Sequence, residues 1–248
     1  QKGARHGHGT YFIADGGHYE GDFKDGKMEG RGTYYYPGNE IYEGEWLDSQ
    51  RSGRGTFTYS DGSVYEGRWE GDMRHGQGLM RNADGGMYHG LWEADKRHGK
   101  GQMTFKDGTE YDGEWAGDVR HGMGALKMPD GGTYEGNFVQ DIPCGDGTLK
   151  DSHDMSSYKG QFLNGLRHGH GTCDYARSKD KFVGEWIKGT RLRGVMYLGD
   201  GEVERVAYQR NILMRREKLS QQEQERLRIE LKGGKPKPAA PAPTPAAE

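Results

Sequence analysis

The sequence has only two cysteines and no long apolar run, which narrows the classes of protein to which it can belong. Cys144 and Cys173 cannot form a disulfide framework, so a reducing, cytosolic setting fits the chain. No run of roughly 18 apolar residues is present to cross a bilayer. No basic stretch leads into an apolar one, as it would in a signal peptide.

Aliphatic residues and net charge are also low. Leu, Ile, Val and Phe together fill 33 of 248 positions, below the level of roughly 20% at which a conventional core becomes hard to build. Disorder also needs a large net charge, and 35 basic against 38 acidic residues leave only −3. Glycine is abundant, at 44 residues, beside 15 Tyr and 5 Trp. We therefore expect recurring aromatic rings to supply the buried surface.

Two short motifs alternate along the chain. The first, Tyr-x-Gly-x-aromatic, recurs every 23 residues and then has two degenerate copies, each after a step of 24. The eight copies begin at Tyr19, Tyr42, Tyr65, Tyr88, Tyr111, Tyr134, Tyr158 and Phe182. The second motif, x-Gly-x-Gly, lies between them and first appears at His6, so the array holds a half-repeat and eight units. Such a fixed period is typical of repeat proteins.

Each unit has the period of a β-strand. In residues 41–63, Tyr42, Gly44 and Trp46 share one parity, and the glutamates between them share the other. Successive side chains of a strand point to opposite faces, so one face carries rings and glycines and the other is polar. We predict that each repeat is a hairpin and that successive hairpins form an antiparallel meander.

The connections between the predicted strands differ in character. Asp61-Gly62 and its counterparts predict tight turns because glycine tolerates a positive φ. The other connection, residues 47–52, is charged, and we expect it to be the longer of the two.

The glycines within the strands need a physical reason, since glycine weakens a strand. We expect each bare backbone position to leave room for an aromatic ring of the neighbouring strand. Large apolar residues also recur two places after the second glycine and predict a continuous stripe on the same face. They are Tyr11, Tyr34, Phe57, Met80, Met103, Leu126 and Leu149.

These motifs carry a family resemblance. Tyr-Glu-Gly-Glu-Trp at residues 42–46 and His-Gly-x-Gly at residues 75–78, on a 23-residue period, resemble the MORN (membrane occupation and recognition nexus) repeat over about residues 4–198. The resemblance implies an all-β fold: an elongated, single-layer antiparallel meander without enzymatic activity of its own. Members of the family include ciliary radial-spoke head proteins, membrane tethers and cytoskeletal proteins.

The composition changes near the C-terminus. Residues 202–208 are expected to form a last strand, and residues 212–232 an α-helix with Asn211 as its N-cap and Gly233-Gly234 as its stop. We expect this helix to cover the open sheet edge, with docking to a partner or a second copy as the alternative. The predicted organisation is a repeat array over residues 1–204, a terminal strand and helix cap over 205–232, and a flexible Pro/Ala-rich tail over 233–248.

No catalytic, metal or cofactor site is predicted. The acidic residues recur with the strand period, which is typical of solvated faces rather than of a unique acid–base pair. No Lys-Ser/Thr follows the glycine pairs to complete a phosphate-binding loop. His75, His98 and His121 would stack about 10 Å apart, too far for one zinc ion. We expect no enzyme activity.

The charge distribution argues against nucleic acid and disfavours membrane lipid as partners. Residues 1–204 carry 25 basic and 33 acidic side chains, and residues 205–248 carry 10 and 5. Anionic lipid and nucleic acid both attract concentrated basic patches, which the repeats lack. Arg215, Arg216 and Lys218 form a short basic cluster interrupted by Glu217.

The aromatic stripe is the predicted site of partner contact, because such surfaces are typical of protein recognition. The alternative is that the rings are buried within the array. The candidate contact residues are Tyr42, Trp46, Phe57, Tyr65, Trp69, Tyr88, Trp92, Tyr111, Trp115 and Tyr134.

We therefore expect a non-enzymatic interaction scaffold. By resemblance, its partners are proteins of a large cytoskeletal complex, and its location is the cytoplasm, most specifically the axoneme of a cilium or flagellum. The glycine-rich edges also leave self-association open. The alternative function is a membrane–cytoskeleton tether that binds anionic phospholipids.

Overall fold

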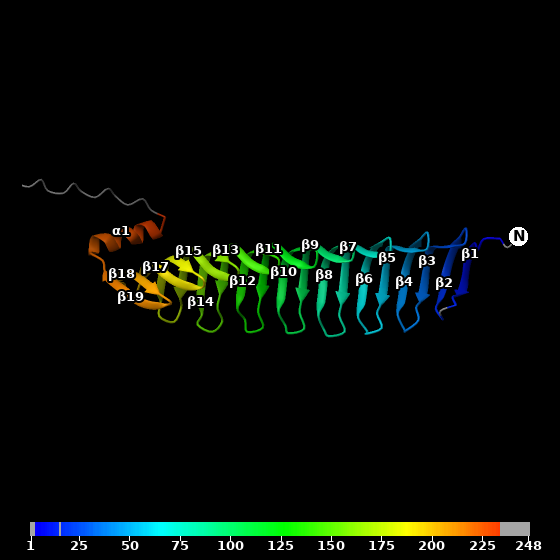
Figure 1. Cartoon of the computed structure of the whole chain (residues 1–248), viewed down its shortest axis with the longest axis horizontal. Helices are drawn as coiled ribbons and strands as arrows, with labels where there is room; N and C mark the ends of the chain where they lie inside the picture. The colour runs from blue at the N-terminus through cyan, green and yellow to red at the C-terminus, as the bar shows by residue number, and fades with distance from the viewer. Residues whose placement is uncertain (1–2, 15, 234–248) are drawn as a thin grey trace, which may run out of the picture. The chain divides into compact units, whose positions relative to one another are not determined.

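The computed structural model describes residues 3–14 and 16–233 (Figure 1). The chain divides into two compact units, one made of residues up to 153 together with 161–166, the other of 154–160 and the residues from 167 onward. The described residues form nineteen β-strands and one α-helix, which confirms the predicted antiparallel meander with a C-terminal helix. Apart from Gly233, the predicted tail over residues 233–248 lies outside the described residues.

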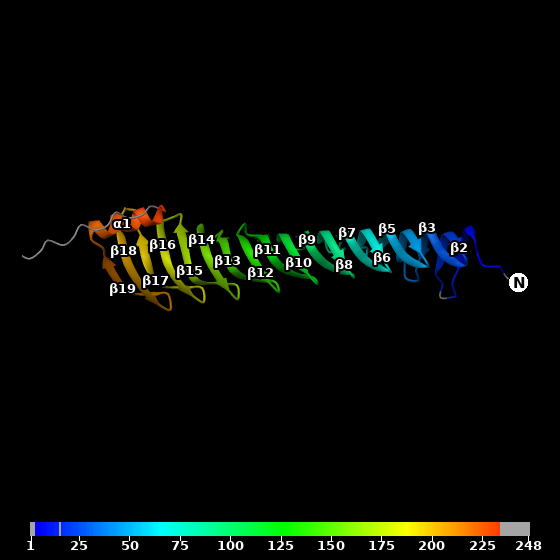
Figure 2. The same cartoon turned by 90° about the horizontal axis from the view of Figure 1, so that it is seen from above.

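The first unit consists mainly of thirteen strands. They are β1 (Gly7–Phe12), β2 (His18–Lys24), β3 (Lys27–Tyr35), β4 (Ile41–Leu47), β5 (Gln50–Thr58), β6 (Val64–Glu70), β7 (Met73–Arg81), β8 (Met87–Glu93), β9 (Lys96–Thr104), β10 (Glu110–Ala116), β11 (Val119–Lys127), β12 (Thr133–Val139) and β13 (Ile142–Lys150). Figures 1 and 2 show these strands following one another in a single layer.

The remaining elements end the chain. Residues of β14 (Ser156–Leu163) and β15 (Leu166–Tyr175) belong to both units. The second unit also holds β16 (Asp180–Ile187), β17 (Thr190–Tyr197), β18 (Val203–Gln209), β19 (Ile212–Lys218) and the helix α1 (Gln221–Leu231).

The strand register puts the rings of the repeated motif in the first unit on one face, whereas Phe12 and Tyr35 stack on His18 on the other face. Within a hairpin, Tyr42 lies opposite Phe57 and Gly44 opposite Gly55. Between hairpins, Phe57 lies opposite Tyr65. Because directly opposite residues point to the same side of a sheet, one face is aromatic and the other polar. We call them the ring face and the polar face.

The two kinds of connection between strands have the opposite relative lengths to those predicted. Asp48 and Ser49 form a two-residue turn between β4 and β5, with φ values of 51° and 67°. Positive φ at both positions is typical of the type I′ turn, whose twist matches that of a hairpin. The prediction of a longer connection over residues 47–52 was therefore wrong: the turn is short, and the strands continue up to it.

The Asp-Gly pairs lie in the longer connections. Between β5 and β6 the loop has five residues and is closed by a hydrogen bond from the Tyr59 N–H to the Ser63 carbonyl, at 2.9 Å. Gly62 has the expected positive φ of 88°. The Asp61 carboxylate accepts the Ser63 N–H at 2.8 Å. This side-chain bond stabilises the longer loop.

The predicted helix over residues 212–232 was wrong in its first third. Residues 212–218 form β19, because Arg210 and Asn211 repeat the positive-φ turn, at 48° and 67°, and return the chain along β18. The helix begins after Ser220, whose hydroxyl accepts the Glu223 N–H while the Glu223 carboxylate accepts the Ser220 N–H. This capping box, Ser-x-x-Glu, is visible in the sequence and marks the true start.

The helix packs beside the loop that connects β17 and β18. It was expected instead to cover the open edge of the sheet. The Tyr197 hydroxyl donates to the Leu227 carbonyl at 3.3 Å, and Arg228 donates to the Gly201 carbonyl. Leu219, just before the helix, and Gln224, within it, are buried. Among the described residues, β19 pairs with β18 alone.

Candidate functional site

The ring face forms the core of the sheet. All ten residues predicted to contact a partner lie on it, and each is at most 5% exposed. The prediction of partner contact stays a prediction, but burial gives these rings a structural role within the chain.

The tyrosine that begins each repeat motif, from Tyr19 to Tyr158, lies over a pair of glycines on adjacent strands. A side-chain carbon on Gly44 or Gly55 would collide with the Tyr42 ring and hydroxyl. That hydroxyl donates to the backbone carbonyl of Glu45 at 3.0 Å. The ring therefore occupies the space that the glycines leave, as the sequence predicted.

The rings pack edge to face along the array. Tyr42 lies 5.0 Å from Trp46 of its own strand at 88°, and 5.4 Å from Trp69 of the next hairpin at 85°. These perpendicular arrangements favour the contact of a positive ring edge with a negative ring face. The Trp46 indole N–H also donates to the Gly32 carbonyl at 3.1 Å, so a buried polar atom is paired.

An arginine covers the ring pairs of four successive repeats, a feature that the sequence analysis missed. The Arg51 guanidinium lies 4.3 Å from the centre of the Trp69 ring, and its Nε donates to the Asp72 carboxylate at 3.2 Å. The same pairing, with aspartate 21 residues after arginine, recurs in the next three hairpins. It joins Arg74 to Asp95, Arg97 to Asp118 and Arg120 to Asp141. These arginines could have been found from the sequence, because they recur every 23 residues, with the period of the repeat.

Burial alters the acidity of the tyrosines. Desolvation raises the pKa of Tyr88, Tyr111 and Tyr134 to about 12 each, from the ordinary value of 10.0. These groups stay neutral at physiological pH and serve as hydrogen-bond donors, which does not fit a role as acid or base catalysts.

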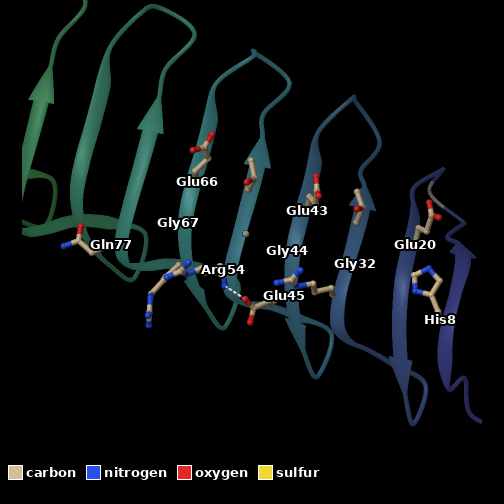
Figure 3. A pocket seen from close by; sticks show the side chains of 15 residues that line it. His8, Glu20, Gly32, Glu43, Gly44, Glu45, Arg54, Glu66, Gly67 and Gln77 are labelled. Carbon is tan, nitrogen blue, oxygen red and sulfur yellow. Dashed lines mark hydrogen bonds between the residues drawn. The ribbon is translucent and has the colours of Figure 1, made fainter.

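The polar face carries a groove in the first unit, shown in Figure 3, with a volume of about 800 Å³. Its floor includes the glycines of several strands. Acidic side chains form one row, Glu20, Glu43 and Glu66, and a mostly basic row runs beside the glycines. This second row holds Arg31, Glu45, Arg54, Arg68 and Gln77. The arrangement suits ion pairs with an extended partner, and none of the predicted contact residues lines it.

The described residues offer neither a metal-binding cluster nor a membrane-spanning helix. Within residues 3–14 and 16–233, no cluster of three or more His, Cys, Asp or Glu side chains is placed to hold a metal ion. In the same part of the chain, no helix has the length and apolar character needed to cross a membrane. His75 and His98 each lie beside a glutamate, Glu70 at 3.5 Å and Glu93 at 3.2 Å.

Comparison with known families agrees with the repeat geometry. The MORN repeat matches residues 1–18, 19–40, 42–64, 65–87, 88–110, 111–133, 134–152 and 158–178, well over half of the chain. The chain belongs to the MORN repeat family. This is a non-enzymatic repeat family, and its repeats indicate a protein-interaction or membrane-binding role.

The unit beginning at Phe182 lies outside the matched MORN residues but keeps their geometry. Phe182 and Trp186 are 5.4 Å apart at 85°, and Phe182 lies over Gly184 and Gly194 as tyrosines do elsewhere. The degenerate eighth motif therefore packs like the others.

Solved structures offer only weak similarity to this MORN protein. The TCP10 domain of Danio rerio CPAP, as wild type and as a mutant, has 10% identity and a TM-score of 0.43, covering 85% of this chain and 99% of that one. A streptogramin B lyase has 8% identity and a TM-score of 0.17, covering 82% and 83%. No curated protein matches the chain. We draw no functional conclusion from these similarities.

Proposed function

We propose that this MORN protein is a non-enzymatic scaffold that binds partner proteins in a cytoskeletal assembly through the groove of its polar face. The observation that carries the proposal is the groove itself, which crosses several strands and is lined by charged side chains of both signs. Because the Tyr and Trp rings of the repeats are buried, the groove offers a partner a more accessible regular pattern of side chains.

The spacing of the groove charges defines a suitable partner. Glu20, Glu43 and Glu66 occur once per repeat, on every second strand. Adjacent strands lie about 4.8 Å apart, so these carboxylates repeat about every 10 Å. An extended segment or a helix with basic side chains at that spacing would pair with the row, and complementary charge would fix its register.

We propose that the assembly is a radial spoke or doublet-associated complex in the axoneme of a cilium or flagellum. Support comes from the resemblance of the repeats to those of radial-spoke head proteins. The regular charge period also suits a partner with a repeating structure.

Fractionation of ciliated cells tests the proposal. The tagged chain should stay with the axoneme after detergent removes the membrane, and Glu43→Arg with Glu66→Arg should release it. Glu70→Arg is the matched control, because Glu70 is exposed outside the groove and its reversal should leave the chain in place. Recovery of all three proteins in the detergent-soluble fraction would contradict the axonemal assignment.

Vesicle binding tests the membrane alternative. The basic cluster on β19 is already paired: Arg216 with Glu204, Arg215 with Glu217, and Lys218 with Glu202. Because paired cations attract anionic lipid less, we expect no salt-sensitive sedimentation with vesicles of phosphatidylserine and phosphatidylinositol bisphosphate. Strong sedimentation would favour the tether.

A further inference from the structure

Charges on the polar face are paired between neighbouring hairpins. The residue between the two glycines of x-Gly-x-Gly lies opposite the residue that follows the glycine of the next Tyr-x-Gly-x-aromatic motif. In several repeats this register joins a basic residue to an acidic one, and such pairs stabilise a sheet. They are His8 with Asp22, Arg31 with Glu45, Lys100 with Glu114 and His170 with Glu185. Two further pairs are uncharged, Gln77 with Leu91 and Met123 with Asn137.

Arg54 and Arg68 depart from this pattern. They occupy the same two places but lie directly opposite each other across β5 and β6, with like charges. Within its own hairpin Arg68 lies opposite His75, which is 3.5 Å from Glu70. Like charges at directly opposite positions destabilise a sheet. The pair is therefore unfavourable unless a negative group compensates it.

The carboxylates beside the two arginines are engaged elsewhere. Glu66, two residues before Arg68 on the same face, pairs with Arg81 at 2.8 Å. The Glu45 carboxylate accepts the backbone N–H of Arg54 at 3.2 Å (Figure 3). Within the part of the chain that the structure describes, neither the Arg54 nor the Arg68 guanidinium makes an ion pair or a hydrogen bond. Both groups are free to bind an anion.

The two arginines are placed to share one anion. Both side chains are exposed and line the groove of the polar face. Side chains at directly opposite positions begin about 5 Å apart, and each guanidinium offers a planar fork of N–H donors. A phosphate monoester carries nearly two negative charges and three acceptor oxygens, so it can compensate both arginines. A carboxylate has one charge and would leave the second arginine uncompensated.

The acidic row next to the pair indicates where the phosphate comes from. Glu43 and Glu66 both lie opposite Thr56, one row away from the arginines. A membrane surface would press further anionic headgroups against these carboxylates. A protein segment can instead place basic side chains there. Its lysines would lie about three residues apart, because two strand spacings, about 10 Å, equal three residues of extended chain.

We propose that Arg54 and Arg68 bind a phosphorylated serine or threonine of the partner segment in the groove. Lysines on either side of the phosphorylated residue pair with Glu43 and Glu66. This inference rests on the proposed function, because it names the chemistry of the partner that occupies the same groove.

A labelled peptide, Ala-Ala-Lys-Ala-Ser-Lys-Ala-Ala, with and without phosphate on the serine, tests the proposal by fluorescence anisotropy with the full chain. Phosphorylation should strengthen binding about tenfold or more, because hydrogen bonds to charged groups are strong. Equal binding of the two forms would overturn this inference and leave the groove as a peptide site. Absence of binding by both forms up to about 1 mM would also overturn it. The proposed function is judged separately, by retention of the chain in the axoneme.

Arg54→Gln locates the phosphate site. The variant should lose most of the gain from phosphorylation and bind the unphosphorylated peptide as the parent protein does. Because it removes a like-charge contact, it should be no less stable than the parent protein in urea denaturation. Lys100→Gln is the matched control, since Lys100 occupies the equivalent place of another repeat and lies outside this groove. An undiminished gain from phosphorylation in Arg54→Gln would overturn the proposal.

Vesicles that contain phosphatidylinositol bisphosphate distinguish a lipid headgroup from a phosphorylated protein. We expect the parent protein and Arg54→Gln to behave alike, with neither sedimenting. Sedimentation of the parent protein that Arg54→Gln abolishes would overturn the proposal, because a lipid headgroup would then be the ligand of the arginine pair.

Discussion

The Tyr42 ring closes over Gly55 of the neighbouring strand and donates its hydroxyl proton to the Glu45 carbonyl at 3.0 Å. One side chain thus buries apolar surface on two strands and satisfies its own polar atom. Repetition of this contact from hairpin to hairpin explains how a sheet with few aliphatic residues obtains a core.

Valine at Gly55 should destabilise the first unit strongly. The added atoms would overlap the Tyr42 ring, and overpacking of this kind costs about 1–3 kcal/mol or more. Urea denaturation followed by tryptophan fluorescence measures the change. Gly9→Val is the matched control, because no atom of the described residues lies within 4 Å of a carbon added there. Similar losses of stability in both variants would contradict the role assigned to the tyrosine ring.

Much of the fold could be predicted because its periods are visible in the sequence. The alternation around Tyr42 and Gly44 fixed the ring face, and the 23-residue repeat fixed the hairpin. The Asp-Gly pairs alone did not show which connection is the shorter one. The two-residue turn forms at Asp48-Ser49, where both residues adopt positive φ although neither is glycine. Residues 212–218 have helix-forming composition, and only pairing with β18 makes them a strand.

The candidate site was harder to predict than the fold. The alternation of side chains along each strand separates the two faces of the sheet, but it does not show which face is buried. Burial of the rings depends on Arg51 and its counterparts, which lie over them. The groove of the polar face arises from strands far apart in the sequence, such as β2 and β6. Single motifs therefore could not reveal it.

Trp69→Ala should unfold or severely weaken the array, whereas Trp69→Phe should be tolerated. The indole is buried against Tyr42, Tyr65 and Arg51, and truncation of a buried tryptophan to alanine costs about 3–5 kcal/mol. Phenylalanine occupies the same place naturally at Phe138, which packs on Tyr134 at 5.1 Å. Thermal denaturation distinguishes the variants. A stable Trp69→Ala protein that has lost partner capture would show instead that the rings bind the partner.

Arg74 and Asp95 should be energetically coupled. The Arg74 Nε donates to the Asp95 carboxylate at 2.9 Å, and the guanidinium lies 4.3 Å from the Trp92 ring. Because the aspartate is half exposed, we expect a coupling of about 1 kcal/mol in a double-mutant cycle of Arg74→Ala with Asp95→Ala. Arg74→Lys keeps the positive charge but loses the contacts of the planar guanidinium group, so it should remain less stable than the parent protein. Additive effects of the two alanine substitutions would contradict the coupling.

Alkaline solution should unfold the first unit as its tyrosines ionise. Burial raises the pKa of Tyr88, Tyr111 and Tyr134 to about 12 in the folded protein, against 10.0 for the ordinary side chain. The unfolded chain therefore releases these protons first, and the folded state loses stability as the pH rises from about 10 through about 12. Circular dichroism should report cooperative loss of β-structure over that range, together with tyrosinate absorbance at the same midpoint.

Tyr111→Phe provides the control for alkaline unfolding. The variant lacks one ionisable group and the hydrogen bond to the Glu114 carbonyl at 2.9 Å. It should therefore be less stable than the parent protein at neutral pH, but its stability should fall less steeply with pH, because the slope is proportional to the difference in bound protons between the two states. An unchanged slope would mean that Tyr111 ionises equally readily in both states, and the ring would then not be sealed beneath its neighbours.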